Sequence, residues 1–302
     1  MPAKPPLMLI GDFTVPRLRE SLDANYDVRR DPAPGIRAVV TNGGVGIDAA
    51  TIDLLPNLEI IALCSVGYET VDVAYAHKRG IPVTYTPDVL TDDVADLAIG
   101  LMLAVYRRIA QQDALVRRGE WAKARALTRR LTGRRIGILG LGRIGLAIAH
   151  RAAPFAGEIA YHARNARSDV PYRYAESAAA LAASVDVLVV ATAGGAGTAH
   201  LVDAAVIDAL GPDGVIVNIA RGSVIDEDAM VAALVDGRLG GAGLDVFAHE
   251  PHVPEALFAC DNVVLIAHQG SATIETRTAM GQLVIDNLAA HFAGEPLLTP
   301  IG

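Results

Sequence analysis

The sequence of 302 residues has few of the features that mark secreted or membrane proteins. It contains two cysteines, Cys64 and Cys260, and both lie in or beside apolar strand-like runs, as reduced core thiols do. No apolar run is long enough to span a membrane, and no apolar signal-peptide core follows the segment Met1-Pro-Ala-Lys-Pro-Pro6. These absences predict a cytoplasmic protein.

Concentrated positive charge is also absent. The chain has 26 Lys and Arg against 34 Asp and Glu, a formal net charge of −8, and its basic residues form no block beyond pairs such as Arg107-Arg108. Nucleic acid and anionic membranes bind basic patches, so neither is an expected partner. Aromatic residues make up 5% and apolar residues 52% of the chain, which is typical of an ordinary α/β protein.

Short apolar strands alternate with helical segments, a pattern that predicts an α/β fold with parallel sheets. The length favours two domains, because single cores rarely grow to this size. The expected division is 1–97, then 98–284, with 285–302 returning to the first domain. The segment 91–118 is predicted to be one helix, apolar on most of its surface and therefore buried between domains or subunits.

One glycine-rich stretch predicts a bound dinucleotide. In Arg135-Ile-Gly-Ile-Leu-Gly140-Leu-Gly142-Arg-Ile-Gly145, a short strand runs into G-x-G-x-x-G and then into a helix. Gly140 allows the sharp turn, Gly142 the close approach of a pyrophosphate, and Gly145 the packing of helix on strand. A turn without a ligand is the less favoured alternative. A second glycine cluster at 42–46 lacks this spacing and is expected to be a plain βα turn.

Polar residues follow the later strands of the second domain. Arg221 follows the strand predicted at 214–219, Glu250 the strand at 243–247, and His268 the strand at 262–266. Ligands bind beyond the carboxyl ends of parallel strands, so these three side chains are expected at one edge of the sheet.

In this order and spacing the motifs resemble those of the D-isomer-specific 2-hydroxyacid dehydrogenases, in particular the glyoxylate/hydroxypyruvate and hydroxyphenylpyruvate reductase branch. The resemblance covers nearly the whole chain. It rests on the segments 65–72, 87–100, 140–145, 218–222, 243–251, 268–271 and 296–300. It implies two Rossmann-like domains with parallel sheets, the discontinuous one (1–97 and 285–302) binding substrate, and it implies a homodimer.

The resemblance assigns the catalytic roles. Arg221 would bind the carboxylate and keto oxygen of a small 2-keto acid, His268 would be the acid/base, and Glu250 would hydrogen-bond His268. The backbone N–H groups of Val66 and Gly67 would bind the substrate carboxylate from the other domain. The chemistry agrees, because a guanidinium fork suits two oxygens and His titrates near neutrality. Each residue by itself could also be a surface cation, a capping carboxylate or a core histidine.

The resemblance also implies the cofactor contacts, which are Gly140, Gly142, Arg143, Ile144, Gly145, Arg164, Asn165, Thr192, Ile219, Ala220, Asp245 and Gly270. An NAD site places an acid about 20 residues past the glycines, where it binds the ribose 2′-hydroxyl. Here Arg164 and Asn165 stand in that place, and no acid occurs before Asp169. Since Arg pairs with a 2′-phosphate, NADPH is the expected cofactor in preference to NADH.

Several alternatives stay open at this point. The substrate could instead be hydroxyphenylpyruvate or 2-ketogluconate, and a nucleotide-sensing, corepressor-like binding protein is the rival from another class. Tyr68, Met102, Trp121 and His249 are candidate substrate determinants. No metal is expected, because the histidines near Glu250 lack a third ligand at metal spacing. Ala267, Gln269 and the glycine-rich 193–197 depart from the family pattern and put substrate detail and the adenosine side of the cofactor site in doubt.

Overall fold

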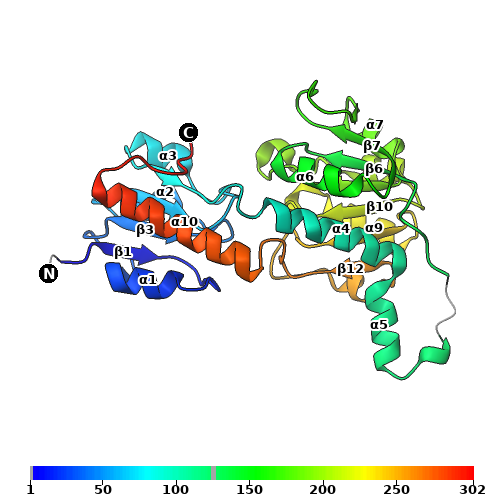
Figure 1. The fold of residues 1–302 in the computed structure, drawn as a ribbon, viewed down its shortest axis with the longest axis horizontal. Coiled ribbons are helices and arrows are strands. Elements are labelled where there is room, and N and C mark those ends of the chain that lie inside the picture. Colours follow the sequence, from blue (N-terminus) through cyan, green and yellow to red (C-terminus); the bar gives the residue numbers. More distant parts are fainter. Residues whose placement is uncertain (1–2, 124–126) are drawn as a thin grey trace. The chain divides into compact units, whose positions relative to one another are not determined.

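The computed structural model describes residues 3–123 and 127–302, which form two compact units (Figure 1). Unit 1 comprises Met1–Leu90 and Ser271–Gly302, and unit 2 comprises Thr91–Gly270. Each has its own parallel sheet, which confirms the expected fold class, and unit 1 is discontinuous. The expected boundaries after 97 and 284 fall inside helices α4 (Thr91–Arg107) and α10 (Ile274–Ala293). The units instead divide before these helices, because each helix packs as a whole in one unit.

Unit 1 is a five-stranded parallel sheet in the order β2-β1-β3-β4-β5. The strands are β1 (Pro6–Leu9), β2 (Asp27–Arg29), β3 (Ala38–Thr41), β4 (Ile60–Leu63) and β5 (Val83–Thr84). The helices are α1 (Leu18–Asn25), α2 (Ala49–Asp53), α3 (Val73–Lys78) and α10. Strands β3 and β4 are buried along their length, as sheets covered on both faces require. The short edge strand β2 was not predicted, because none of its residues is buried and it therefore has no apolar run.

Unit 2 is a seven-stranded parallel sheet in the order β12-β11-β10-β9-β6-β7-β8. The strands are β6 (Arg134–Leu139), β7 (Ala156–His162), β8 (Arg173–Tyr174), β9 (Val187–Val190), β10 (Val215–Asn218), β11 (Gly241–Leu244) and β12 (Val263–Leu265). The helices are α4, α5 (Ile109–Arg117), α6 (Arg143–Ala152), α7 (Ala178–Ala183), α8 (Ala204–Leu210) and α9 (Glu227–Val235). The order of strands reverses between β6 and β9, and such a switch point opens a crevice at the carboxyl ends.

The single helix predicted over 91–118 is wrong, since Arg108 takes a left-handed conformation (φ 49°) that separates α4 from α5. Helix α4 packs on α6 and on the sheet of its own unit, where Gly243 of β11 lies under Leu101. A Cβ at Gly243 would meet the Leu101 Cβ at 3.0 Å. The apolar surface of α4 is therefore covered within unit 2, whereas α5 has no buried residue.

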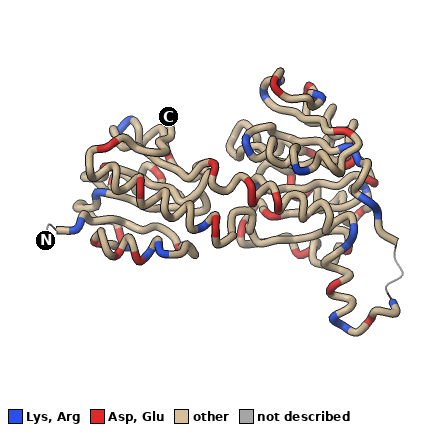
Figure 2. Tube along the Cα trace, viewed as in Figure 1, with Lys and Arg blue, Asp and Glu red and all other residues tan. Residues whose placement is uncertain are grey.

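Charged residues of both signs are interspersed over each unit (Figure 2). Both cysteines are free, and burial raises the pKa of the Cys64 thiol to about 12. In the described part of the chain, no helix combines the length and the apolar character that crossing a membrane requires.

Candidate active site

The glycine turn between β6 and α6 has the geometry of a phosphate cradle. Gly140 has a positive φ of 97°, and a Cβ there would lie 2.6 Å from the backbone nitrogen of Thr192. A Cβ at Gly145 would lie 2.0 Å from the carbonyl oxygen of Gly140. By contrast, a Cβ at Gly142 would meet nothing within 4 Å, and Gly142 is the N-cap residue of α6 and supplies no side-chain cap. The first N–H groups of α6 are thus open to a phosphate, so these residues fit a dinucleotide.

The loop after β7 holds the residues expected at the ribose. Arg164 and Asn165 are both exposed. The Arg164 side chain makes no hydrogen bond or ion pair with another described residue. The acid that follows, Asp169, pairs with Arg167 at 2.5 Å. The loop after β7 therefore carries an exposed, unengaged cation and an acid that is already paired.

The end of β10 presents Arg221. Asn218, which is almost fully buried, accepts the N–H of Ala220 at 3.0 Å and donates to the Arg221 carbonyl at 3.0 Å, so its amide closes the turn. Gly222 then passes so close to the next loop that a Cβ would lie 1.9 Å from the carbonyl carbon of Phe247. The half-buried Arg221 guanidinium donates from Nη1 to the Ala220 carbonyl at 2.7 Å.

Glu250 and His268, from the loops after β11 and β12, form a hydrogen-bonded pair. His268 Nδ1 lies 2.7 Å from Glu250 Oε2, and Glu250 Oε1 accepts the N–H of Phe247 at 3.0 Å. Burial raises the pKa of Glu250, but the hydrogen bonds from His268 and Phe247 and the charges of His268 and Arg221 outweigh it, leaving that pKa below its ordinary value. Glu250 is therefore a carboxylate near neutrality, and Nε2 is the His268 nitrogen left to face a substrate.

Asp245 holds the His268 loop in place. Its carboxylate accepts the N–H groups of Gln269 at 2.6 Å and Gly270 at 2.9 Å, and its carbonyl accepts the N–H of His268 at 2.8 Å. His268 has a left-handed backbone (φ 52°), a costly conformation for a non-glycine residue that persists because these bonds fix it. Burial raises the pKa of Asp245 although both hydrogen bonds oppose the shift.

The remaining residues expected to contact cofactor lie near the same strand ends. Arg143 and Ile144 form the first turn of α6, Thr192 follows β9, and Ile219 and Ala220 follow β10 with little exposed surface. The residues predicted to be catalytic and those predicted to contact the cofactor thus all lie in unit 2.

The expected carboxylate-binding loop belongs to unit 1, where Val66 and Gly67 follow β4. Ser65 Oγ donates to the Gly67 carbonyl at 2.7 Å and so fixes the turn. The N–H groups of Val66 and Gly67 donate to no acceptor among the described residues, and Val66 is partly exposed whereas Gly67 is buried. Neighbouring Tyr68 is exposed and packs edge-on against Tyr85.

Among the other candidate substrate determinants, Met102 is fully buried in α4. A fully buried side chain cannot contact a substrate, so the prediction for Met102 is wrong. Trp121 is 74% exposed, and the backbone of His249 accepts the N–H of His252 at 2.8 Å. Among the described residues, no group of three His, Cys, Asp or Glu could hold a metal ion.

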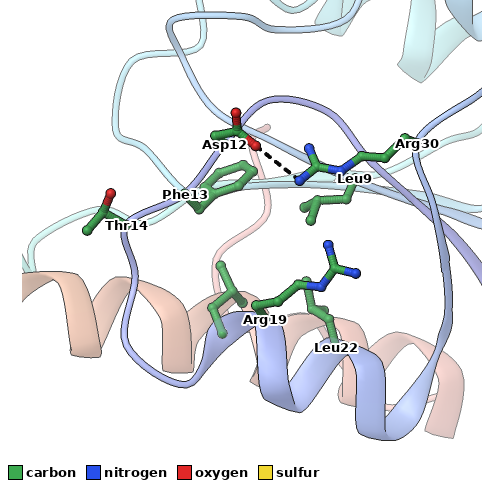
Figure 3. Close-up of a pocket in the computed structure, with 8 residues that line it drawn as sticks. Leu9, Asp12, Phe13, Thr14, Arg19, Leu22 and Arg30 are labelled. Carbon is green, nitrogen blue, oxygen red and sulfur yellow. Dashed lines mark hydrogen bonds and ion pairs between the residues drawn. The ribbon is translucent and has the colours of Figure 1, made fainter.

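Unit 1 also contains a cavity of about 190 Å³ beyond the end of β1, and none of the expected site residues lines it (Figure 3). Its two arginines are engaged by carboxylates, Arg30 by Asp12 at 3.0 Å and Arg19 by Asp23 at 2.7 Å.

Three residues that hold the site together carried no assigned role in the sequence. Asn218 closes the Arg221 turn, Tyr161 supports the loop after β7, and Glu227 accepts the N–H of Ala248 at 2.9 Å beside the Glu250 loop. The role of Asn218 could have been predicted, because an Asn at the end of a buried strand often caps the next turn. The roles of Tyr161 and Glu227 could not, because their hydrogen-bond partners lie in other segments of the chain.

The comparisons with known proteins agree with this geometry. Residues 99–270 match the family model described as "D-isomer specific 2-hydroxyacid dehydrogenase, NAD binding domain". The chain belongs to the D-isomer specific 2-hydroxyacid dehydrogenase family. Members of this family that resemble it include the hydroxyphenylpyruvate reductase of Plectranthus scutellarioides, 55% identical over 89% of this chain and 86% of the relative. The 2-ketogluconate reductase of Gluconobacter oxydans is 44% identical over the full length of both chains.

Among solved dehydrogenase structures, the NADPH-dependent glyoxylate/hydroxypyruvate reductase of Sinorhizobium meliloti, in complex with NADP and malonate, superposes with a TM-score of 0.92. The two chains are 43% identical, and the superposition covers 99% of this chain and 97% of the Sinorhizobium chain. The family and the glycine turn together make this chain a dehydrogenase with a nicotinamide cofactor site.

Two alanine substitutions separate the roles of the glycines in this dehydrogenase. Gly145→Ala forces a Cβ against the Gly140 carbonyl, so we expect the free energy of unfolding to fall by about 1–3 kcal/mol. Gly142→Ala meets no atom and has a φ of −76°, so stability should hold while affinity for the dinucleotide falls. Thermal unfolding and calorimetric titration with NADP⁺ measure the two effects. Wild-type affinity in Gly142→Ala would contradict the assignment of Gly142.

Proposed function

We propose that this enzyme uses NADPH to reduce small 2-keto acids, glyoxylate and hydroxypyruvate, to D-2-hydroxy acids. The observation that carries the proposal is the 2.7 Å hydrogen bond between Glu250 and His268, with the charge of Arg221 acting on the same carboxylate. This acid, base and cation share a unit with the dinucleotide turn. Relatives include the glyoxylate/hydroxypyruvate reductase A of Arabidopsis thaliana, 53% identical over 88% of this chain and 85% of the relative.

In the proposed mechanism, the Arg221 guanidinium binds the substrate carboxylate and the keto oxygen and so polarises the carbonyl carbon. A nicotinamide dinucleotide held at the Gly140–Gly145 turn would supply a hydride for this carbon. His268, protonated and oriented through Nδ1 by Glu250, gives its Nε2 proton to the developing alkoxide oxygen. The Glu250 carboxylate stabilises the imidazolium before transfer, and the N–H groups of Val66 and Gly67 bind the carboxylate.

We also propose that the enzyme is a homodimer. Apolar side chains remain exposed on and after α5, where Ile109 is 52%, Val116 is 46% and Trp121 is 74% exposed. Such surface favours association with a second copy.

The preference for NADPH is proposed on the basis of Arg164. Substitution of Arg164 by Ala should raise the KM for NADPH by roughly 10–100-fold, as expected when a charge-assisted hydrogen bond to phosphate is lost. The KM for NADH should change little, so NADH serves as the internal control. Steady-state kinetics with both cofactors measure the ratio, and an unchanged KM for NADPH would overturn the preference.

The direct test of the function is loss of reduced-nicotinamide absorbance with NADPH and NADH on glyoxylate, hydroxypyruvate, hydroxyphenylpyruvate and 2-ketogluconate. Faster turnover of the first two acids with NADPH supports the proposal. Hydroxyphenylpyruvate is the second candidate, because the relative from Plectranthus is 55% identical. Binding of NADPH without any turnover would reject the reductase and favour a nucleotide-sensing protein.

A further inference from the structure

The loop after β7 holds two arginines in different surroundings. Arg164 is exposed and makes no hydrogen bond or ion pair with a described residue. Arg167 is held at three points. Its backbone N–H donates to the Tyr161 hydroxyl at 2.6 Å, its Nη1 donates to the Leu141 carbonyl at 2.9 Å, and its Nε and Nη2 donate to Asp169 at 3.0 and 2.5 Å.

The contact between Arg167 and Leu141 joins two parts of the cofactor site. Leu141 lies between Gly140 and Gly142, in the turn that faces the pyrophosphate in a dinucleotide-binding fold. Arg167 lies in the loop that faces the ribose. One guanidinium therefore connects the segment expected at the pyrophosphate with the segment expected at the adenosine ribose, and both of these groups occur in NADPH and in NADH.

The core of unit 2 anchors this loop. Tyr161 is fully buried in β7 and packs edge-on against Tyr174 at 5.4 Å. Tyr174 donates from its hydroxyl to the Ala163 carbonyl at 3.2 Å, at the start of the loop. The Tyr161 hydroxyl is the acceptor for Arg167 at its end. The buried Tyr161 and the half-buried Tyr174 thus fix both ends of the segment that carries Arg164.

The charges of the two arginines also differ in availability. Asp169 holds the Arg167 guanidinium by two hydrogen bonds, so its positive charge is largely compensated and its pKa is raised. No described residue pairs with the positive charge of the Arg164 guanidinium. A phosphate would gain more from Arg164 than from a guanidinium already paired with a carboxylate.

We propose that Arg167 is a positioning residue, which fixes the Arg164 loop against the Gly140–Gly142 turn and sets the affinity for NADPH and NADH alike. Arg164, by contrast, binds the 2′-phosphate that only NADPH carries. The inference rests on the proposed cofactor site and adds to it the residue that holds the site in shape.

The test is calorimetric titration of wild type, Arg164→Ala, Arg167→Ala and Tyr161→Phe with NADP⁺ and with NAD⁺. We expect Arg167→Ala to raise both dissociation constants by roughly 10-fold, with their ratio unchanged within about 2-fold. Tyr161→Phe, which removes one anchor, should raise both by a smaller factor. Arg164→Ala should weaken NADP⁺ alone. Arg173→Ala is the matched control, because it removes an exposed 2.5 Å ion pair with Glu158 in the same unit and should change neither constant.

The outcomes are distinct. If Arg167→Ala weakens NADP⁺ alone, Arg167 is a phosphate ligand and the proposal is overturned. If it changes neither constant while thermal unfolding shows an intact fold, the proposal is likewise overturned. If Arg164→Ala leaves NADP⁺ binding unchanged, the NADPH preference fails, yet the NAD⁺ titrations of Arg167→Ala still decide the positioning role.

Discussion

Substitution of His268 by Gln is expected to lower kcat for keto-acid reduction by roughly 10²–10⁴-fold, the usual contribution of a positioned general acid. The physical reason is that Nδ1 is held by Glu250 at 2.7 Å, which directs Nε2 to deliver the proton. The fold should hold, because the His268 backbone, not its side chain, makes the bond to the Asp245 carbonyl. Single-turnover absorbance measurements with saturating NADPH report the chemical step.

His252→Gln is the matched control, since His252 lies in the Glu250 loop and is exposed. It should retain wild-type kcat, and both variants should bind NADP⁺ and melt as the wild type does. A His268→Gln variant with kcat within about 10-fold of wild type would exclude His268 as the proton donor.

The pH dependence of reduction tests the role of Glu250. Its pKa is lowered, so Glu250 stays a carboxylate across the neutral range and loses its charge only in acid. In the proposed mechanism this carboxylate is the acceptor that holds His268 Nδ1 at 2.7 Å. The rate of reduction should therefore fall as pH drops through the lowered pKa of Glu250, and Glu250→Gln, which has no carboxyl to protonate, should lack this fall. The same loss of rate in acid in Glu250→Gln would show that Glu250 does not act through His268.

Substitution of Arg221 by Lys is expected to lower kcat/KM by roughly 10²–10³-fold, the size of effect found when one electrostatic stabiliser of a developing oxyanion is removed. Lysine keeps the charge but loses the planar fork that binds two oxygens at once. The turn itself should survive, because Asn218 bonds to the Arg221 carbonyl and to the Ala220 N–H.

Arg238→Gln is the control for loss of an arginine in unit 2, where Arg238 pairs with Asp208 at 2.6 Å on the surface. Its kcat/KM should stay within about 2-fold of wild type. Steady-state kinetics on glyoxylate, with thermal unfolding in parallel, measure both variants. Wild-type kcat/KM in Arg221→Lys would remove Arg221 from the proposed mechanism.

The sequence by itself determined the parallel α/β fold, the glycine turn and the edge of the sheet at which Arg221, Glu250 and His268 lie. These follow from local patterns, since apolar runs of strand length mark buried parallel strands and the next polar residue must emerge at a carboxyl end. That His268 donates the proton remains a proposal, which rests on the position of His268 at this edge of the sheet.

Only the tertiary structure decided how these residues are held. The break at Arg108 depends on a backbone conformation that helical periodicity does not reveal, and β2 is too short and exposed to carry a pattern. The bonds of Asp245 to Gln269 and of Arg167 to Leu141 join segments more than twenty residues apart in the chain. Hydrogen bonds between distant segments form only when packing of the strands brings their loops together, so local sequence patterns cannot specify them.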